Sequence, residues 1–380
     1  MENLSLYIHI PFCVRKCLYC DFLSFPVGEM DYVNHYVNLL CREIILRAPA
    51  YKKYRVISVF FGGGTPSLLP AVELGRIMNA VRGSFAVAAD AEITVECNPG
   101  TVTAEKLAYY ITSGINRLSI GLQSADDEEL ARIGRIHDYQ TFLTTYRLAR
   151  EAGFHNINID LMTALPGQTT GSYRRTLERV CGLSPEHISA YSLILEEGTP
   201  LYVNQTDYTF PDEEEERELY YMTERVLSKA GYHRYEISNY AREGRECRHN
   251  KVYWKRGSYL GLGLGAASLI ENVRWKNPEE MEAYRARVET ADQEGTTDKE
   301  VQILSRQEQM EEYMFLGLRL MEGVKETAFL RAFGVSVDAV YGDTVARLVE
   351  QGLLVRADGR LFLSPRGIDV SNVVFADFLL

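Results

Sequence analysis

The chain has 380 residues, which is long enough for one large α/β domain and a smaller second one, and 46% of its residues are hydrophobic. Its formal net charge of −11 excludes an overall electrostatic attraction to nucleic acid or anionic lipid. The seven cysteines are irregularly spaced, no signal peptide is visible, and no apolar run approaches the length of a membrane span. We therefore expect a cytoplasmic protein with no membrane span, associated with membranes only through its partners.

The first predicted strand, residues 4–10, leads directly into Cys13, Cys17 and Cys20, which are spaced C-x3-C-x2-C. Thiolates on one short loop can converge on a compact metal centre, and three ligands for a cubane of four irons leave one iron open to a ligand that is not protein. The alternative is a zinc site completed by one distant side chain. The candidates for that fourth ligand are His9, Cys97 and Cys247.

Six β-rich runs alternate with amphipathic segments over the first half of the chain. The predicted strands are residues 4–10, 56–61, 92–96, 117–122, 156–161 and 187–195. The predicted helices are residues 31–47, 71–81, 104–112, 139–152 and 172–181. This order is typical of βα units around a parallel sheet, and it predicts an α/β barrel, complete or partial. Sites of such barrels lie on the loops at the carboxyl ends of the strands.

Polar or glycine-rich residues follow almost every predicted strand. They are Gly62, Gly63, Gly64 and Thr65 after the second strand, Glu96 at the end of the third, Gln123 after the fourth, Arg135 on the next helical stretch and Asp160 on the fifth. A lone glycine triplet is more often a tight turn than a cofactor loop, and a lone aspartate is commonly a helix cap. Their joint placement predicts a cofactor site on one rim, where glycine lets backbone amides approach a ligand closely.

After residue 199 the alternation of strands and helices stops. The acidic run 212–216 is typical of a solvated helix start, where carboxylates face the positive end of the helix dipole. Farther on, the aromatic segment 249–254 precedes the glycine-rich segment 261–268. From the residues alone, the simpler interpretation of this segment is a packed connector in which His249 and Asn250 cap backbone groups.

The charged region 277–305 has few large apolar residues and is expected to be a surface connector. Beyond it we predict helices over 307–320, 326–333 and 338–351, a hairpin of strands 353–356 and 360–363, and a last helix after Pro365. Helices followed by a hairpin suggest a winged-helix-like domain. From Ser305 onward eight Lys or Arg stand against eleven Asp or Glu, which disfavours nucleic-acid binding. The expected division is a barrel over 1–235, a connector over 236–304 and a C-terminal domain over 305–380.

Taken together, these motifs resemble the radical S-adenosylmethionine (SAM) enzymes. The resemblance runs from Leu6 almost to the C-terminus and is nearest to the subfamily that contains oxygen-independent coproporphyrinogen III oxidase and the radical-SAM haem chaperone. The matching segments are Tyr-Ile-His-Ile-Pro-Phe-Cys at 7–13, Gly-Gly-Gly-Thr-Pro at 62–66, Arg-Leu-Ser-Ile-Gly-Leu-Gln-Ser at 117–124, the stretch 161–168 that ends in Leu-Pro-Gly-Gln, and 249–254. The implied fold is a partial (β/α)6 TIM-like radical-SAM barrel.

The resemblance also implies cofactors and their contacts. Cys13, Cys17 and Cys20 would ligate a [4Fe–4S] cluster, and SAM would chelate the open iron. The positions that match contacts to this first SAM are Tyr7, Tyr19, Gly63 and Glu96. The positions that match a second SAM site in the oxidase are Gly64, Thr65, Gln123, Arg135 and Asp160. An electron donor is implied as well, because an electron entering the cluster would cleave SAM to a 5′-deoxyadenosyl radical.

One departure from the oxidase pattern bears on function. The oxidase resembles C-x3-C-x2-C-x-C, whereas Phe22 stands here at the position of the additional cysteine. The chaperone family also carries H-N-x-x-Y-W, present as His249, Asn250, Tyr253 and Trp254. The resemblance implies a haem-related role for this segment, with His249 as a candidate iron ligand and Tyr253 and Trp254 as candidate stacking partners of a porphyrin.

The function implied is therefore a haem chaperone, which binds haem as cargo and delivers it to haem-requiring proteins such as respiratory membrane enzymes. The alternative is an enzyme that oxidatively decarboxylates coproporphyrinogen III to protoporphyrinogen IX. A third possibility is a radical-SAM enzyme acting on another tetrapyrrole.

Overall fold

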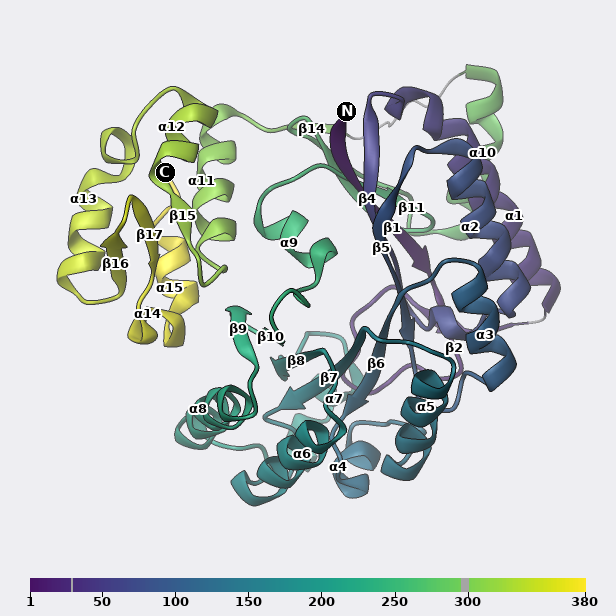
Figure 1. Cartoon of the computed structure of the whole chain (residues 1–380), viewed down its shortest axis with the longest axis horizontal. Helices are drawn as coiled ribbons and strands as arrows, with labels where there is room; N and C mark the ends of the chain where they lie inside the picture. Colours follow the sequence, from purple (N-terminus) through teal and green to yellow (C-terminus); the bar gives the residue numbers. More distant parts are fainter. Residues whose placement is uncertain (29, 295–300) are drawn as a thin grey trace.

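The computed structural model of the chain describes residues 1–28, 30–294 and 301–380 (Figure 1). A twelve-stranded sheet forms its centre, with the strand order β14-β13-β12-β11-β1-β4-β5-β6-β7-β8-β10-β9. Six neighbouring strands pair in parallel, as the sequence predicts. They are β1 (Glu2–Ile10), β4 (Tyr54–Gly63), β5 (Val87–Cys97), β6 (Arg117–Gln123), β7 (Ile157–Thr163) and β8 (His187–Ser192). The order is open at both ends, so the predicted partial barrel is confirmed.

Helices cover the outer face of this sheet (Figure 1). They are α1 (Met30–Arg47), α2 (Ala71–Ser84), α3 (Ala104–Thr112), α4 (Asp127–Arg132), α5 (Tyr139–Glu151), α6 (Thr170–Leu183) and α8 (Glu213–Lys229). The short helix α7 (Pro200–Val203) lies instead at the cysteine loop, where the Leu201 N–H donates to the Leu18 carbonyl at 2.9 Å. Short pieces between them are β2 (Phe12–Cys13), β3 (Phe25–Pro26) and the 3-10 helices Ala48–Tyr51, Pro66–Leu68 and Gln205–Asp207. Capping boxes start α6 at Thr169 and α8 at Asp212, so the acidic run is the solvated helix start that the sequence predicts.

The expected connector joins the sheet at both of its edges. Beyond β8 the edge strands are β10 (Asn239–Ala241) and β9 (His233–Glu236); beyond β1 they are β11 (Tyr259–Leu262), β12 (Ala267–Ile270), β13 (Val273–Lys276) and β14 (Val301–Ile303). The short helix α9 (Arg248–Trp254) lies between the two edges in the chain. The strands of this expected connector, over the described residues 236–294 and 301–303, are therefore part of the central sheet.

The prediction of a surface excursion after residue 277 is wrong for α10 (Met281–Glu294), which packs on α1. Tyr284 of α10 is fully buried and donates a hydrogen bond of 2.8 Å to Glu43 of α1. Glu43 also accepts hydrogen bonds from the Gly263 N–H (2.7 Å) and the Asn277 amide (2.8 Å) and pairs with Arg47 at 3.0 Å. One buried carboxylate thus fastens the last part of the sheet to the first helix.

The C-terminal part has a hydrophobic core of its own and stands beside the barrel (Figure 1). Its helices are α11 (Arg306–Gly317), α12 (Glu326–Phe333), α13 (Val337–Glu350), α14 (Pro365–Asp369) and α15 (Ser371–Ala376), and its strands β15 (Val324–Lys325), β16 (Leu354–Ala357) and β17 (Arg360–Leu363) form one small sheet. The three helices and the hairpin lie where the sequence predicts them. Across the described ranges 1–28, 30–294 and 301–380, no helix combines the length and apolar character needed to cross a membrane.

We expect Glu43→Ala to lower the free energy of unfolding by about 3–5 kcal/mol, because it leaves a buried guanidinium and several buried donors without their acceptor. Urea unfolding followed by circular dichroism measures the change. Glu128→Ala is the matched control, since the Glu128–Arg132 pair is exposed and is worth less than about 1 kcal/mol. Equal midpoints for the two variants would contradict the role of Glu43.

Candidate functional site

The three motif cysteines lie on the loop that follows β1, against the glycine-rich turn after β4. Cys13 is buried at the end of β2, and its sulfur is 3.5 Å from the Thr65 hydroxyl. Cys17 and Cys20 are joined by a backbone hydrogen bond of 3.2 Å, and the Cys17 sulfur accepts from the Arg135 guanidinium at 3.5 Å. The fold therefore brings Thr65 and Arg135, two residues predicted for a cofactor site, directly to the cysteines.

The surroundings of the cysteines fit a three-thiolate site better than zinc with a distant fourth ligand. His9 is engaged at both ring nitrogens, by the Tyr7 hydroxyl at 3.1 Å and the Leu23 carbonyl at 2.9 Å. Burial raises the pKa of the Cys97 thiol and of the Cys247 thiol to about 12, which disfavours the thiolate that binds metal. None of the three candidates is thus poised as a fourth ligand.

The three thiols are not yet gathered on one centre. Among the residues that the structure describes, no group of three His, Cys, Asp or Glu side chains could hold a metal ion as they stand. The Cys13 sulfur contacts Thr65, and the Cys17 sulfur contacts Arg135.

The glycines at the end of β4 allow close packing within the protein and do not leave backbone amides free for a ligand. Gly63 has a φ of +112°, and a Cβ there would lie 2.4 Å from the His9 ring. A Cβ on Gly64 would lie 2.7 Å from the Phe12 carbonyl oxygen. The Gly63 N–H donates to Glu96 at 3.2 Å and the Gly64 N–H to Ile10 at 2.8 Å. The expectation that these amides are free for a ligand is therefore not met, because the protein itself uses them.

A cavity of about 230 Å³ opens beside this turn into the barrel. Among the predicted positions it is lined by Tyr7, Gly63, Glu96 and Asp160, and Phe22 lines it as well. Its other lining residues are Phe60, Arg117, Ser119, Asn158, Ser189, Tyr191 and Asn250. Residues from all six parallel strands thus converge on one space.

Arg135 organises a second group of predicted residues near the cysteines. Its guanidinium donates to the Asn98 side chain at 2.8 Å and to the Gly121 carbonyl at 2.7 Å. Gly121 permits this approach, because a Cβ there would lie 3.1 Å from both the Arg135 guanidinium and the Gln123 amide. Asn98 in turn donates to Thr65 at 2.8 Å.

The two predicted SAM sets are interleaved in space. Tyr19, assigned to the first set, lies beside Arg135 of the second, and burial raises the pKa of its hydroxyl. Asp160, assigned to the second set, shares the cavity with Glu96 of the first. The structure therefore places these residues around one continuous region rather than in two separate sites.

His249 lies inside the protein instead of facing a ligand. It is 1% exposed, its Nδ1 is 3.0 Å from the Ser58 hydroxyl, and its Nε2 is 2.9 Å from the Tyr253 hydroxyl. The ring stacks on Phe60, and burial lowers its pKa to about 3. The expectation that His249 is available as an iron ligand does not hold in this structure. The neighbouring Asn250 is the residue of this motif that lines the cavity.

Residues 7–180 match the radical SAM superfamily and residues 304–370 match the HemN C-terminal domain. The chain is 35% identical to the heme chaperone HemW of Bacillus subtilis (strain 168), over 99% of both chains. It belongs to the HemW family of radical SAM proteins.

Two further similarities agree with this assignment. The chain is 35% identical to the heme chaperone HemW of Escherichia coli (strain K12), over 96% of this chain and 97% of that protein. The solved structure of the Escherichia coli coproporphyrinogen III oxidase HemN superposes with a TM-score of 0.86 at 24% identity, over 100% of this chain and 90% of that one. The second likeness shows that the two proteins share a fold, and the predicted radical-SAM resemblance is confirmed.

The electrostatics of the barrel cavity centre on two carboxyl groups. Burial, reinforced by the negative charge of Asp160, raises the pKa of Glu96 to about 8. Burial also raises the pKa of Asp160, opposed by hydrogen bonds from Asn158 at 2.8 Å and Ser119 at 3.0 Å. At neutral pH Glu96 is therefore largely protonated, and a cationic ligand would favour its ionised form.

Several residues that line the cavity are not among the predicted site positions. Arg117 and Ser119 on β6 lie in the matching segment 117–124, and Asn158 on β7 lies two positions before the predicted Asp160. Since alternate side chains of a strand share a face, this spacing is a sequence signal for the inside of the barrel. Asn250 belongs to the H-N-x-x-Y-W motif, but no such spacing places it at the cavity, because its position depends on how α9 packs.

We expect Glu96→Gln to flatten the pH dependence of stability. Since the pKa of Glu96 is about 8 in the folded protein against an ordinary 4.5, the folded state holds up to one extra proton between these values. The free energy of unfolding should therefore fall as pH rises from 5 to 8, by up to roughly 1.4 kcal/mol per unit from this group. Urea unfolding at pH 5, 6.5 and 8 measures it.

Glu128→Gln provides the control for this pH series, because Glu128 is exposed and its loss should leave the wild-type profile unchanged. Parallel pH profiles for wild type and Glu96→Gln would show that Glu96 titrates normally.

Proposed function

We propose that this chain is a haem chaperone, which binds haem and passes it to haem-requiring proteins. The observation that carries the proposal is the 35% identity to the Bacillus subtilis heme chaperone HemW over 99% of both chains. Phe22, where the oxidase pattern would have a further cysteine, favours the same function. The proteins that receive the haem, among them respiratory membrane enzymes, and an electron donor are the partners that this function requires.

We propose further that Cys13, Cys17 and Cys20 hold a [4Fe–4S] cluster next to bound SAM. Membership of the radical SAM superfamily supports both cofactors. Together they supply one-electron chemistry when bound. Arg135, which already lies 3.5 Å from the Cys17 sulfur, would offset negative charge on the thiolates and pair with a ligand carboxylate. Glu96 and Asp160 would accept from amine or hydroxyl groups in the cavity.

The function is tested by titrating haem into the full-length protein and, in parallel, by assaying coproporphyrinogen III turnover in anaerobically reconstituted protein with SAM and a reductant. We expect a stoichiometric complex with a defined Soret band and no protoporphyrinogen IX. Rapid formation of protoporphyrinogen IX without stable haem binding would instead assign the chain to the oxidase reaction. A Cys13→Ala/Cys17→Ala/Cys20→Ala variant should lose the iron of the cluster.

A separate prediction concerns His249. Because both ring nitrogens are engaged and the ring is buried, we expect His249→Ala to lower thermal stability without moving the Soret maximum of bound haem. The loss of buried hydrogen bonds and packing is worth about 2–4 kcal/mol. A shift of the Soret maximum would show instead that α9 opens and that His249 binds the iron.

A further inference from the structure

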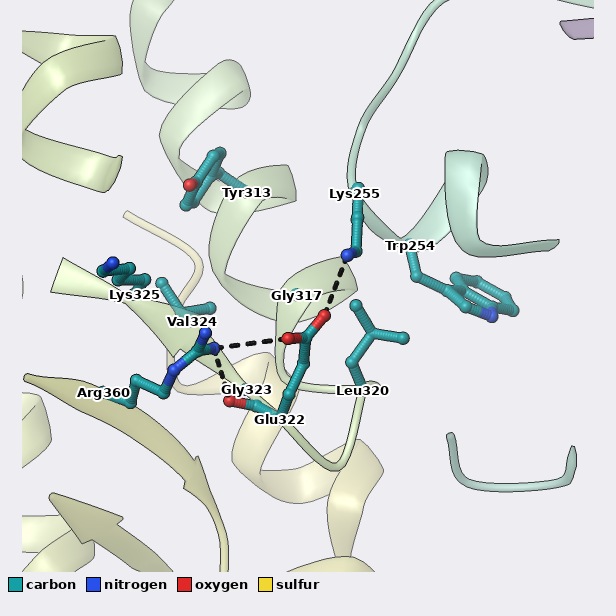
Figure 2. Close-up of a pocket in the computed structure, with 10 residues that line it drawn as sticks. All are labelled: Trp254, Lys255, Tyr313, Gly317, Leu320, Glu322, Gly323, Val324, Lys325 and Arg360. Carbon is teal, nitrogen blue, oxygen red and sulfur yellow. Dashed lines mark hydrogen bonds and ion pairs between the residues drawn. The ribbon is translucent and has the colours of Figure 1, made fainter. Parts of the chain in front are cut away.

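A second pocket lies outside the barrel cavity, between the end of α9 and the C-terminal domain (Figure 2). It has a volume of about 220 Å³. The barrel side contributes Trp254 and Lys255, and the other side consists of α11, the turn after it, β15 and β17. Because both parts of the chain build its walls, the pocket exists only while the C-terminal domain is docked.

The charge of this pocket is opposite to that of the chain. Three cations, Lys255, Lys325 and Arg360, and one carboxylate, Glu322, line it. The formal balance of the pocket is therefore +2, whereas the whole chain carries −11. A concave cationic site can attract anions even on an acidic protein. The charges that line the cleft are close to the ligand, whereas the distant acidic residues are screened by salt.

Glu322 forms ion pairs with two of these cations. Its carboxylate lies 2.8 Å from the Lys255 ammonium and 3.5 Å from the Arg360 guanidinium, which also donates to the Glu322 carbonyl at 3.0 Å (Figure 2). Within the described part of the chain, Lys325 has no ion pair. The Glu322 side chain thus takes the position, between Lys255 and Arg360, in which the carboxylate of a ligand could bind.

The turn that carries Glu322 is fixed in place from both sides. Gly323 has a φ of +62°, and a Cβ there would lie 2.0 Å from the Leu361 carbonyl oxygen. On the barrel side, the Met321 N–H donates to the Tyr235 carbonyl at 3.0 Å, and Leu320 forms a β-bridge with Glu236. The cations therefore face a preformed site, which needs little ordering when a ligand binds.

The remaining wall of the pocket is aromatic and aliphatic. Trp254, Tyr313, Leu320 and Val324 line it. The guanidinium of Arg319 lies 4.3 Å from the centre of the Trp254 ring and helps to fix the indole. A cationic rim next to an apolar wall suits a ligand that carries carboxylates on a flat apolar body.

We propose that this pocket binds the propionates of haem, with Lys255, Lys325 and Arg360 pairing the carboxylates and the edge of the macrocycle resting against Trp254 and Tyr313. The inference rests on the proposed haem-chaperone function and adds to it the site of binding. A volume of about 220 Å³ is below the roughly 300–1,000 Å³ of a pocket that encloses a drug-sized ligand, so it takes the propionate edge while the rest of the macrocycle projects outward.

The test compares haem affinities of full-length variants by Soret titration. Lys255→Glu/Arg360→Glu should weaken haem binding at least tenfold, because it replaces two attractive charges with repulsive ones. Glu322→Gln should strengthen it several-fold, since the competing carboxylate is gone. The matched control is Lys52→Glu/Arg331→Glu, which makes the same change of charge at two exposed residues outside the pocket and should leave the affinity at the wild-type value.

A second probe separates carboxylate pairing from damage to the fold. Iron protoporphyrin IX dimethyl ester has no free carboxylate, so wild type, Lys255→Glu/Arg360→Glu and Glu322→Gln should bind it equally. Wild-type haem affinity in the pocket variants, or an equal loss of affinity for haem and for its ester, would overturn the proposed site. Absence of haem binding by the wild type would contradict the proposed function itself, so the two failures are distinguishable.

Discussion

A buried guanidinium in the barrel is the constraint on which the site depends. Arg117 is 1% exposed, and the negative charges of Glu92 and Asp160 offset the cost of burying it. Asp160 faces the barrel cavity, whereas Glu92 accepts hydrogen bonds from the backbone N–H groups of Arg248 and His249, both at 3.2 Å. The charge of Arg117 is therefore balanced on one side by a carboxylate of the cavity and on the other by the carboxylate that holds α9.

The open barrel explains why α9 and the C-terminal domain sit where they do. Six parallel strands do not close on themselves, so polar side chains inside would meet water unless other elements cover them. α9 covers part of this opening with His249 and Tyr253, and Arg319 of the C-terminal side reaches buried Glu236 at 3.6 Å. Glu312 then pairs with Arg256 at 2.9 Å and Arg274 at 2.7 Å, which fixes the C-terminal domain to the sheet.

Much of this arrangement could be predicted from local sequence patterns, and the rest required knowledge of distant partners. The six strands and the cysteine loop follow from periodicity and spacing, which are local. The sequence alone does not predict helix α10, because its two buried residues, Tyr284 and Val288, are isolated among charged residues. The helix is held by its packing against α1, which is distant in the sequence. In α9 the spacing of four residues places His249 and Tyr253 on the same face of the helix. That this face is the buried one follows only from the contacts of His249 with Ser58 and Phe60, which lie far away in the sequence.

One short helix thus carries two different surfaces. Asn250 lines the barrel cavity, and four residues later Trp254 lines the pocket beside the C-terminal domain. At a rise of 1.5 Å per residue these positions are about 6 Å apart along the helix axis. Because Glu92 fixes the beginning of α9 and Arg319 lies on the ring at its end, a displacement of the helix changes both surfaces together. A ligand in the cavity that favours one position of α9 would therefore alter the affinity of the pocket for its own ligand. Such a coupling is reciprocal, so the ligand of the pocket would alter the affinity of the cavity by the same factor.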